Sequence, residues 1–256
     1  MDNELTKAMR KLQKAQVSNG GWPWFPGMPE SRYITQHIIT GMGHLDNLGV
    51  KNVRENAEVW KMIKKGVGYL DARIVEDYEW TKKHYPNYMK EQHIGQLQIQ
   101  YLYARSYFKD LPMNSKLKEA VAYYQEQAKK YWMKFSIYTE GMIALAAHRF
   151  GIETLPQQVL ASIKERSILH EELGMYWKDN VGGYYWYQAP IETQALLIEA
   201  FDEVNNDENA VEDMKVWLLK QKQTTDWKTT KATAEACYAL LLRGTELLTN
   251  DEMVEI

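Results

Sequence analysis

Apolar residues recur along the chain at helical spacing, in segments of two alternating kinds. In residues 52–76 they follow one another at steps of three and four, which places them along one face of a helix. The same stripe recurs in 115–132, in 207–220, at Leu5, Met9 and Leu12, and in a shorter helix from Pro156. Segments 135–147, 191–201 and 232–242 are instead apolar almost all round, as is typical of helices buried on every side.

The alternation predicts ten helices joined as hairpins, each with an amphipathic outer helix and an apolar inner one. Inner helices share a start, as in Thr35-Gln36 and Thr193-Gln194, which residues 90–107 match only loosely. Glycines 49, 151 and 244 mark helix ends. We predict an all-α fold, an α/α toroid of about five outer/inner helix pairs, as a single domain over residues 1–256. An open superhelix of tetratricopeptide type is disfavoured, because the repeat runs to roughly fifty residues and only one helix of each pair is amphipathic.

A turn rich in glycine and tryptophan joins outer to inner helices, most clearly at residues 16–22 and more weakly at 173–177 and 221–227. The chain has 9 Trp and 17 Tyr but only 5 Phe. In a ring of hairpins these turns emerge at one end, so their aromatic residues either form a binding face or plug the mouth of the barrel. The candidate contact face consists of Trp22, Trp24, Phe25, Tyr176, Trp177, Tyr184, Tyr185, Trp186 and Trp227, with Tyr187 beside them.

Charge and composition exclude several partner classes. The net charge of −3 gives no basic footprint for nucleic acid, and no run of about 18 apolar residues predicts a membrane span. The single cysteine, Cys237, excludes an internal disulfide and is predicted to be a small core residue. The six histidines show no metal spacing, and no phosphate-binding loop is present. We therefore predict neither a metal nor a cofactor.

Acidic residues recur near the starts of inner helices, at Glu140, Glu192 and Glu235. Their repetition favours a structural role at helix N-termini. The alternative is a carbohydrate-active α/α-toroid enzyme, a glycoside hydrolase or lyase, with aromatic turns as sugar platforms. That function requires convergent carboxylates across a cleft, for which Asp179, Glu192 and Asp226 are the candidates.

Three stretches resemble the toroid domain of bacterial α2-macroglobulins: residues 19–25, 190–198 and 217–236. The resemblance covers essentially the whole chain and is most specific in the last stretch, whereas the Gln-x-x-x-Gly-x-Trp turn alone is shared in form with triterpene cyclases. It implies a non-catalytic interaction or scaffold domain of a protease-trapping protein of the cell envelope, periplasmic or at the cell surface. The implied partners are other domains of the parent protein and trapped proteases.

The chain departs from this family in one respect that bears on chemistry. The family's thioester forms within a Cys-Gly-Glu-Gln motif on the first inner helix, and no such motif occurs here. We expect the motif one helix upstream of residue 1, so that this chain is a fragment that forms no covalent bond with a target. Residues 252–256 are expected to begin a following β domain.

Overall fold

The computed structural model describes residues 2–222, 227 and 229–242, and these are 67% helical with eleven α-helices. Strands occur only as two short hairpins among the described residues. The predicted all-α fold is therefore confirmed. Contacts divide the chain into two compact units, Met1–Tyr131 and Trp132–Ile256. Closure into a toroid, and the single domain over 1–256, stay predictions.

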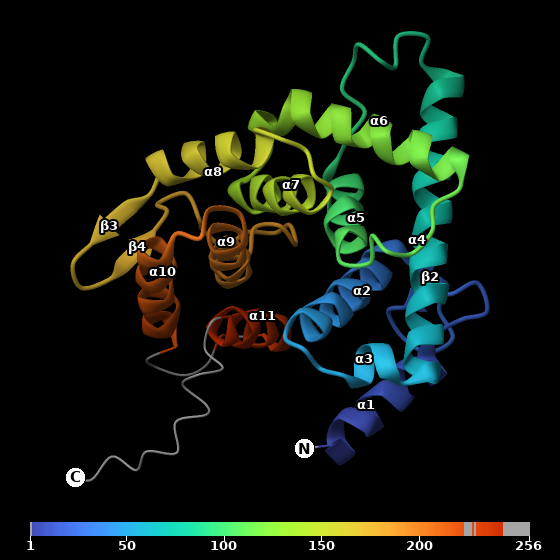
Figure 1. Ribbon diagram of the computed structural model, residues 1–256, viewed down its shortest axis with the longest axis horizontal. Helices are drawn as coiled ribbons and strands as arrows, with labels where there is room; N and C mark the ends of the chain where they lie inside the picture. Colours follow the sequence, from blue (N-terminus) through green and yellow to red (C-terminus); the bar gives the residue numbers. More distant parts are fainter. Residues whose placement is uncertain (1, 223–226, 228, 243–256) are drawn as a thin grey trace. The chain divides into compact units, whose positions relative to one another are not determined.

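The first unit contains six α-helices and one hairpin, shown from blue to green in Figure 1. They are α1 (Asp2–Ala15), β1 (Trp22–Pro23), β2 (Glu30–Ser31), α2 (Arg32–Asn47), α3 (Asn52–Glu55), α4 (Ala57–His84), α5 (Gln96–Ser106) and α6 (Ser115–Tyr131). Helix α2 packs against α4 and α5, and α6 packs along α4. The pattern at 52–76 predicts one helix, but the chain breaks at Asn56, whose extended backbone lets its side chain cap Glu58 and Val59.

A buried ion pair joins α4 to α5 inside this unit. Arg105, 1% exposed, donates from Nε to Oδ1 of Asp71 at 3.0 Å, and the Tyr101 hydroxyl donates to the same oxygen at 2.7 Å. The other guanidinium nitrogens of Arg105 donate to the carbonyls of Phe108 and Leu111. One side chain thus fixes α5, the turn after it and α4.

The second unit contains five α-helices, a 3₁₀ turn and a second hairpin, shown from green to red in Figure 1. They are η1 (Trp132–Lys134), α7 (Ile137–Arg149), α8 (Leu155–Glu165), β3 (Ile168–His170), β4 (Gly174–Tyr176), α9 (Pro190–Asn205), α10 (Glu208–Gln221) and α11 (Thr230–Leu241). Helix α9 packs between α7 and α11, and α8 and α10 cover this layer. Every residue of α7 from Tyr138 to Ala147 is buried, as the apolar pattern predicts.

Helix α11 departs from that prediction of all-round burial. Its buried alanines 232, 236 and 239 recur at steps of three and four and pack on α9, and buried Tyr238 beside them donates to Glu199 of that helix. Residues 233, 234 and 237 are exposed. Cys237 lies on another face and is exposed, which corrects its prediction as a core residue. Asp226, Gly244 and the strand expected at 252–256 lie outside the described residues.

Candidate functional site

The three repeated turns are structural joints, each centred on a buried tryptophan. The indole Nε1 of Trp22 donates to the carbonyl of Leu12 at 2.8 Å, that of Trp177 to Ile163 at 2.8 Å, and that of Trp227 to Leu218 at 3.2 Å. Each acceptor is one of the last four carbonyls of an outer helix (α1, α8 or α10), where the regular helical bonds run out. The Leu12 and Ile163 carbonyls also accept from the backbone amides of Gln16 and Arg166, so the indole adds a second donor. The indole therefore caps the outer helix while its ring fills the space beneath the turn.

Close backbone approach explains the glycines of these joints. Gly20 has a φ of +98°, and a Cβ there would lie 2.3 Å from the carbonyl oxygen of Lys65. Gly174 has a φ of +75°, and its Cβ would lie 2.1 Å from the carbonyl oxygen of Asp213. Only glycine fits either position. Gln194, from the shared start of inner helices, donates to the carbonyls of Met175 and Met214 and holds the second joint from below.

Burial therefore removes three residues from the predicted aromatic contact face. Trp22, Trp177 and Trp227 are 1%, 4% and 6% exposed, so their rings present almost no area at the outer surface. Trp24 and Phe25 are exposed in the first unit, where Trp24 stacks on Tyr33 at 5.7 Å. The other predicted residues, Tyr176, Tyr184, Tyr185 and Trp186, belong to the second unit.

The loop at residues 181–189 presents the most exposed aromatic side chains of the second unit. Tyr184 is 94% exposed and Tyr185 55%, and the rings of Tyr185 and Tyr187 stack with centroids 5.3 Å apart. Gln188 closes the loop, because its side-chain oxygen accepts from the Tyr185 amide at 3.1 Å and its carbonyl accepts from Gly183. The loop is therefore ordered while its tyrosines face solvent; we call it the tyrosine loop.

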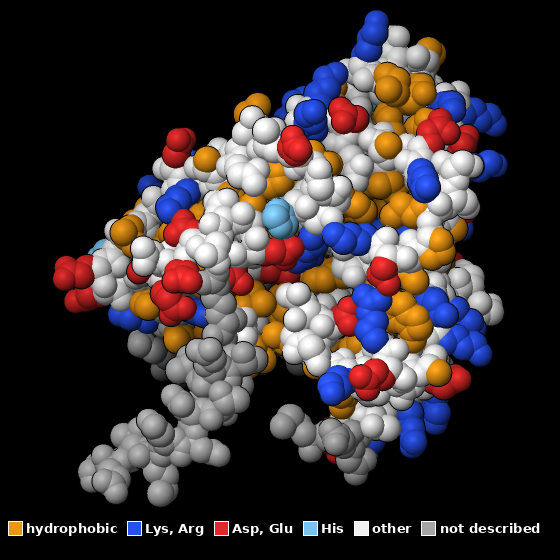
Figure 2. Space-filling model, viewed as in Figure 1, with side chains coloured by type: hydrophobic (Ala, Val, Ile, Leu, Met, Phe, Trp, Pro, Cys, Tyr) orange, Lys and Arg blue, Asp and Glu red, His pale blue; other side chains and the backbone are white. Residues whose placement is uncertain are grey.

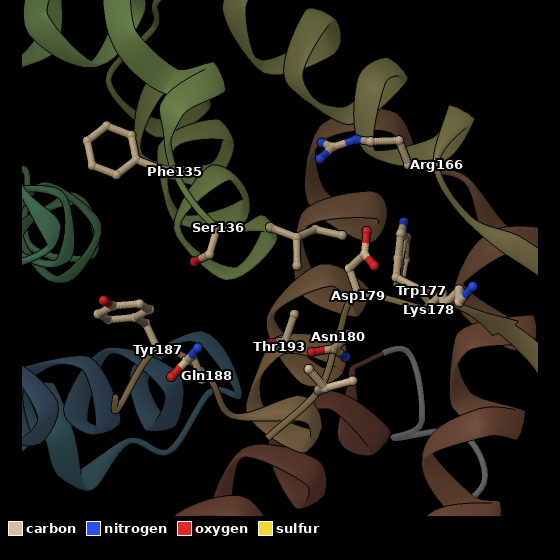
Figure 3. Close-up of a pocket in the computed structure, with 12 residues that line it drawn as sticks. Phe135, Ser136, Arg166, Trp177, Lys178, Asp179, Asn180, Tyr187, Gln188 and Thr193 are labelled. Atoms are coloured by element: carbon tan, nitrogen blue, oxygen red, sulfur yellow. The ribbon is translucent and has the colours of Figure 1, made fainter. Parts of the chain in front are cut away.

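A pocket of about 320 Å³ lies beside the tyrosine loop. In Figure 3, Ser136, Tyr187 and Gln188 lie on one side of it, and Arg166 and Asp179 lie on the other. Its lining is Phe135, Ser136, Ile137, Arg166, Trp177, Lys178, Asp179, Asn180, Val181, Tyr187, Gln188 and Thr193. Hydroxyl, amide and charged groups thus converge between aromatic walls, as in sites that bind and orient a ligand.

The charged residues that line this pocket are Arg166, Lys178 and Asp179. Arg166 is held by Glu140, which is buried and does not line the pocket. Burial raises the pKa of Glu140, and the ion pair with Arg166 opposes that shift. Asp179 is the one carboxylate among the described lining residues, whereas glycoside hydrolysis uses two. Glu192 does not line the pocket and lies 3.8 Å from the amine of Lys231.

Two of the acids near inner-helix starts, Glu140 and Glu192, lie in the first turns of α7 and α9, as predicted, and both also face cations. Glu140 pairs with Arg166 and Glu192 with Lys231. Glu235, on α11, lies near Lys231 and near the carboxylates of Glu199 and Glu192 on α9. Burial raises the pKa of Glu235 to about 7; Lys231 opposes this shift, and the charges of Glu199 and Glu192 add to it.

We expect the stability of the second unit to fall as pH rises from 5 to 8, and Glu235→Gln to remove much of that fall. A folded-state pKa above the unfolded value means that the native state holds a proton which the unfolded chain releases. The stabilisation is complete below the unfolded value of 4.5 and is lost as pH passes 7, by roughly 2–3 kcal/mol. Urea unfolding of both chains across this pH range measures it, with the exposed Glu172→Gln as control.

No protein-family model matches the chain, and no curated protein matches it either. The resemblance to bacterial α2-macroglobulins therefore rests on the three sequence stretches quoted above. No described helix is both long and apolar enough to cross a membrane. Within the described part of the chain, no group of three or more His, Cys, Asp and Glu side chains is placed to hold a metal ion. Figure 2 shows basic and acidic side chains interspersed over the visible face.

The sequence pointed to Asp179 but not to most of the other polar residues of the pocket. Ser136, Arg166, Asn180 and Gln188 come from four separate segments, and no spacing pattern connects them. Gly182-Gly183 next to four aromatic residues was the available signal, since such a segment predicts an exposed loop.

Proposed function

We propose that the chain is a non-catalytic interaction domain whose contact surface is the tyrosine loop with the adjoining pocket. The observation that carries this proposal is the ordered loop with Tyr184 94% exposed beside a polar pocket that has one lining carboxylate. Tyrosine is enriched at binding hot spots because it offers a large rigid apolar area and a polar tip. An ordered loop also loses little conformational freedom on binding.

We further propose that the parent protein is a bacterial α2-macroglobulin-like, protease-trapping protein, periplasmic or at the cell surface. Support comes from the sequence stretches that resemble that family, two of which contain a tryptophan joint. On this proposal, the domain contributes scaffold and contact surface toward other parent domains and a captured protease.

The proposal is tested by binding of subtilisin, blocked at its active-site serine with phenylmethylsulfonyl fluoride, to the immobilised chain. We expect Tyr184→Ala and Tyr185→Ala each to weaken binding about ten-fold, because truncating an interface aromatic typically costs more than 1 kcal/mol. Leu169→Ala is the matched control, since Leu169 is a 69% exposed apolar residue of the same unit outside the loop. Biolayer interferometry gives the dissociation constants.

The enzymatic alternative is tested with xylan, chitin oligosaccharides and peptidoglycan fragments. We expect no new reducing ends from any of them. If reducing ends are released and this activity disappears in Asp179→Asn, the chain is the carbohydrate-active enzyme instead. In the binding experiment, equal affinity of the tyrosine variants and the Leu169→Ala control for subtilisin would show that the loop is not part of the contact surface.

A further inference from the structure

The first unit has a pocket of its own, of about 460 Å³, at the C-terminal half of α4. Its lining comes from α4, α5, α6 and the segment between α4 and α5: Glu76, Asp77, Trp80, Thr81, Tyr85, His93, Gln98 and Tyr124. No site predicted from the sequence includes these residues. Figure 2 shows hydrophobic side chains among charged ones around the upper end of α4.

Aromatic rings form a continuous wall of this pocket. The centroids of Trp80 and Tyr85 lie 5.7 Å apart, and those of Tyr85 and His93 lie 4.3 Å apart. Trp80 is 55% exposed, although His84 stacks on it at 4.6 Å. Tyr124, which also lines the pocket, is 1% exposed. The wall therefore offers electron-rich ring surface that a ligand can reach.

Two carboxylates line the same pocket. Glu76 pairs with Arg73, but both side chains are exposed and three residues apart on one helix, so the pair is weak and exchangeable. Asp77 is held more firmly, since Arg32 and the Gln98 amide both donate to its Oδ2. Glu76 is thus the carboxylate that can turn to a new cation.

His93 provides a third, independent feature. Its Nε2 is buried and has no hydrogen-bond partner within the described part of the chain. Oε2 of Glu91 lies 3.7 Å away, within ion-pair distance of a protonated imidazole but too far for a hydrogen bond. The His93 amide is bonded to Gln127, which fixes the backbone at this point. An unpaired ring nitrogen in a pocket lining is a group for which a bound donor would supply the partner.

The chain already combines these elements elsewhere in the first unit. The guanidinium of Arg54 lies 4.4 Å from the ring centroid of Trp60 and is paired with Asp46 at 2.7 Å and Asp110 at 2.8 Å. A tryptophan face and two carboxylates therefore hold a guanidinium in this same protein. The pocket at Trp80 presents a tryptophan, two carboxylates and an additional unpaired acceptor.

We propose that this pocket binds the guanidinium group of an arginine side chain presented by a partner polypeptide. The planar guanidinium stacks on the Trp80 and Tyr85 wall, donates to Glu76 and offers a hydrogen to His93 Nε2. Arginine fits better than lysine because only a flat, multi-donor cation meets a ring face and two acceptors at once. The site lies in the first unit, so this proposal is tested independently of the one for the tyrosine loop in the second unit.

The test is a titration of the intact ¹⁵N-labelled chain with Nα-acetyl-arginine N-methylamide. Binding is monitored by NMR through the indole Nε1–H signals of the 9 tryptophans. The signal that disappears in Trp80→Ala identifies Trp80. We expect that signal to shift with a millimolar dissociation constant. The uncharged isostere Nα-acetyl-citrulline N-methylamide is expected to bind at least about five-fold more weakly, because it keeps the shape and loses the charge.

Matched variants give the decisive outcome. Trp80→Ala and Glu76→Gln are each expected to weaken arginine binding about three-fold or more. Binding by these variants is measured through backbone amide signals. Both substitutions change exposed side chains. Trp24→Ala, an exposed tryptophan of the same unit outside the pocket, leaves binding unchanged. Equal affinity for arginine and citrulline, or unchanged binding in Trp80→Ala, overturns the proposal.

Discussion

We expect Trp177→Ala to lower the free energy of unfolding of the second unit by about 3–5 kcal/mol. Trp177 is 4% exposed and packs on Phe201, so alanine leaves a cavity in the core of this unit. The variant also removes the indole donor from the Ile163 carbonyl at the end of α8. Because the joint positions β4 and α9 as well as α8, the loss is larger than for an aromatic residue that touches one element.

Urea unfolding monitored by circular dichroism measures this loss, and two variants separate its parts. Trp177→Phe keeps most of the ring volume but removes the indole donor, so that the Ile163 carbonyl keeps only its bond from the Arg166 amide. We therefore expect a smaller loss, of about 1 kcal/mol for the hydrogen bond. Tyr184→Ala, which removes a 94% exposed ring from the same unit, is expected to change stability by less than about 0.5 kcal/mol. Equal effects for Trp177→Ala and Tyr184→Ala would contradict the assignment of Trp177 as a joint.

The helices could be predicted because the sequence carries two independent signals for them: the spacing of apolar residues along the helix, and a glycine after its last residue. The stripe at 52–76 indicates α4, and Gly49 and Gly151 both adopt the left-handed φ of +75° expected beyond a helix end. The break at Asn56 escaped prediction because the apolar stripe runs through it, whereas the cap depends on one side chain. The two hairpins escaped because strands of two and three residues leave no alternation to detect.

The candidate site could be predicted only in part, because tryptophans close together in the sequence can be buried or exposed. Trp22 and Trp24 are two residues apart, yet the first is buried and the second is 56% exposed. What separates them is the indole partner: the chain folds Trp22 back onto the Leu12 carbonyl, a contact set by three-dimensional geometry. Pockets share this difficulty, because Ser136 and Gln188 meet only after α7 and α9 have packed.

We expect Arg105→Met to destabilise the first unit by about 3–5 kcal/mol, because it leaves the carboxylate of Asp71 buried without its cation. The carbonyls of Phe108 and Leu111 lose their donors in the same step. Burial already raises the pKa of Asp71, an effect that Arg105 opposes, so in the variant this pKa rises further. The native state then gains from protonation, and the deficit relative to the parent shrinks as pH falls from 8 to 5.

The double variant Asp71→Asn/Arg105→Met distinguishes a lost charge pair from lost packing. We expect it to be more stable than Arg105→Met alone at pH 8 and to show no pH-dependent deficit, since no unpaired charge stays buried. Lys7→Met is the matched control: it breaks an ion pair with Glu4 whose side chains are 56% and 79% exposed, and should cost less than about 0.5 kcal/mol. Urea unfolding at pH 5 and pH 8 gives the free energies of unfolding of the parent chain, Arg105→Met, the double variant and Lys7→Met. A deficit in Arg105→Met that is the same at both pH values would show that Arg105 acts through its backbone hydrogen bonds and not through Asp71.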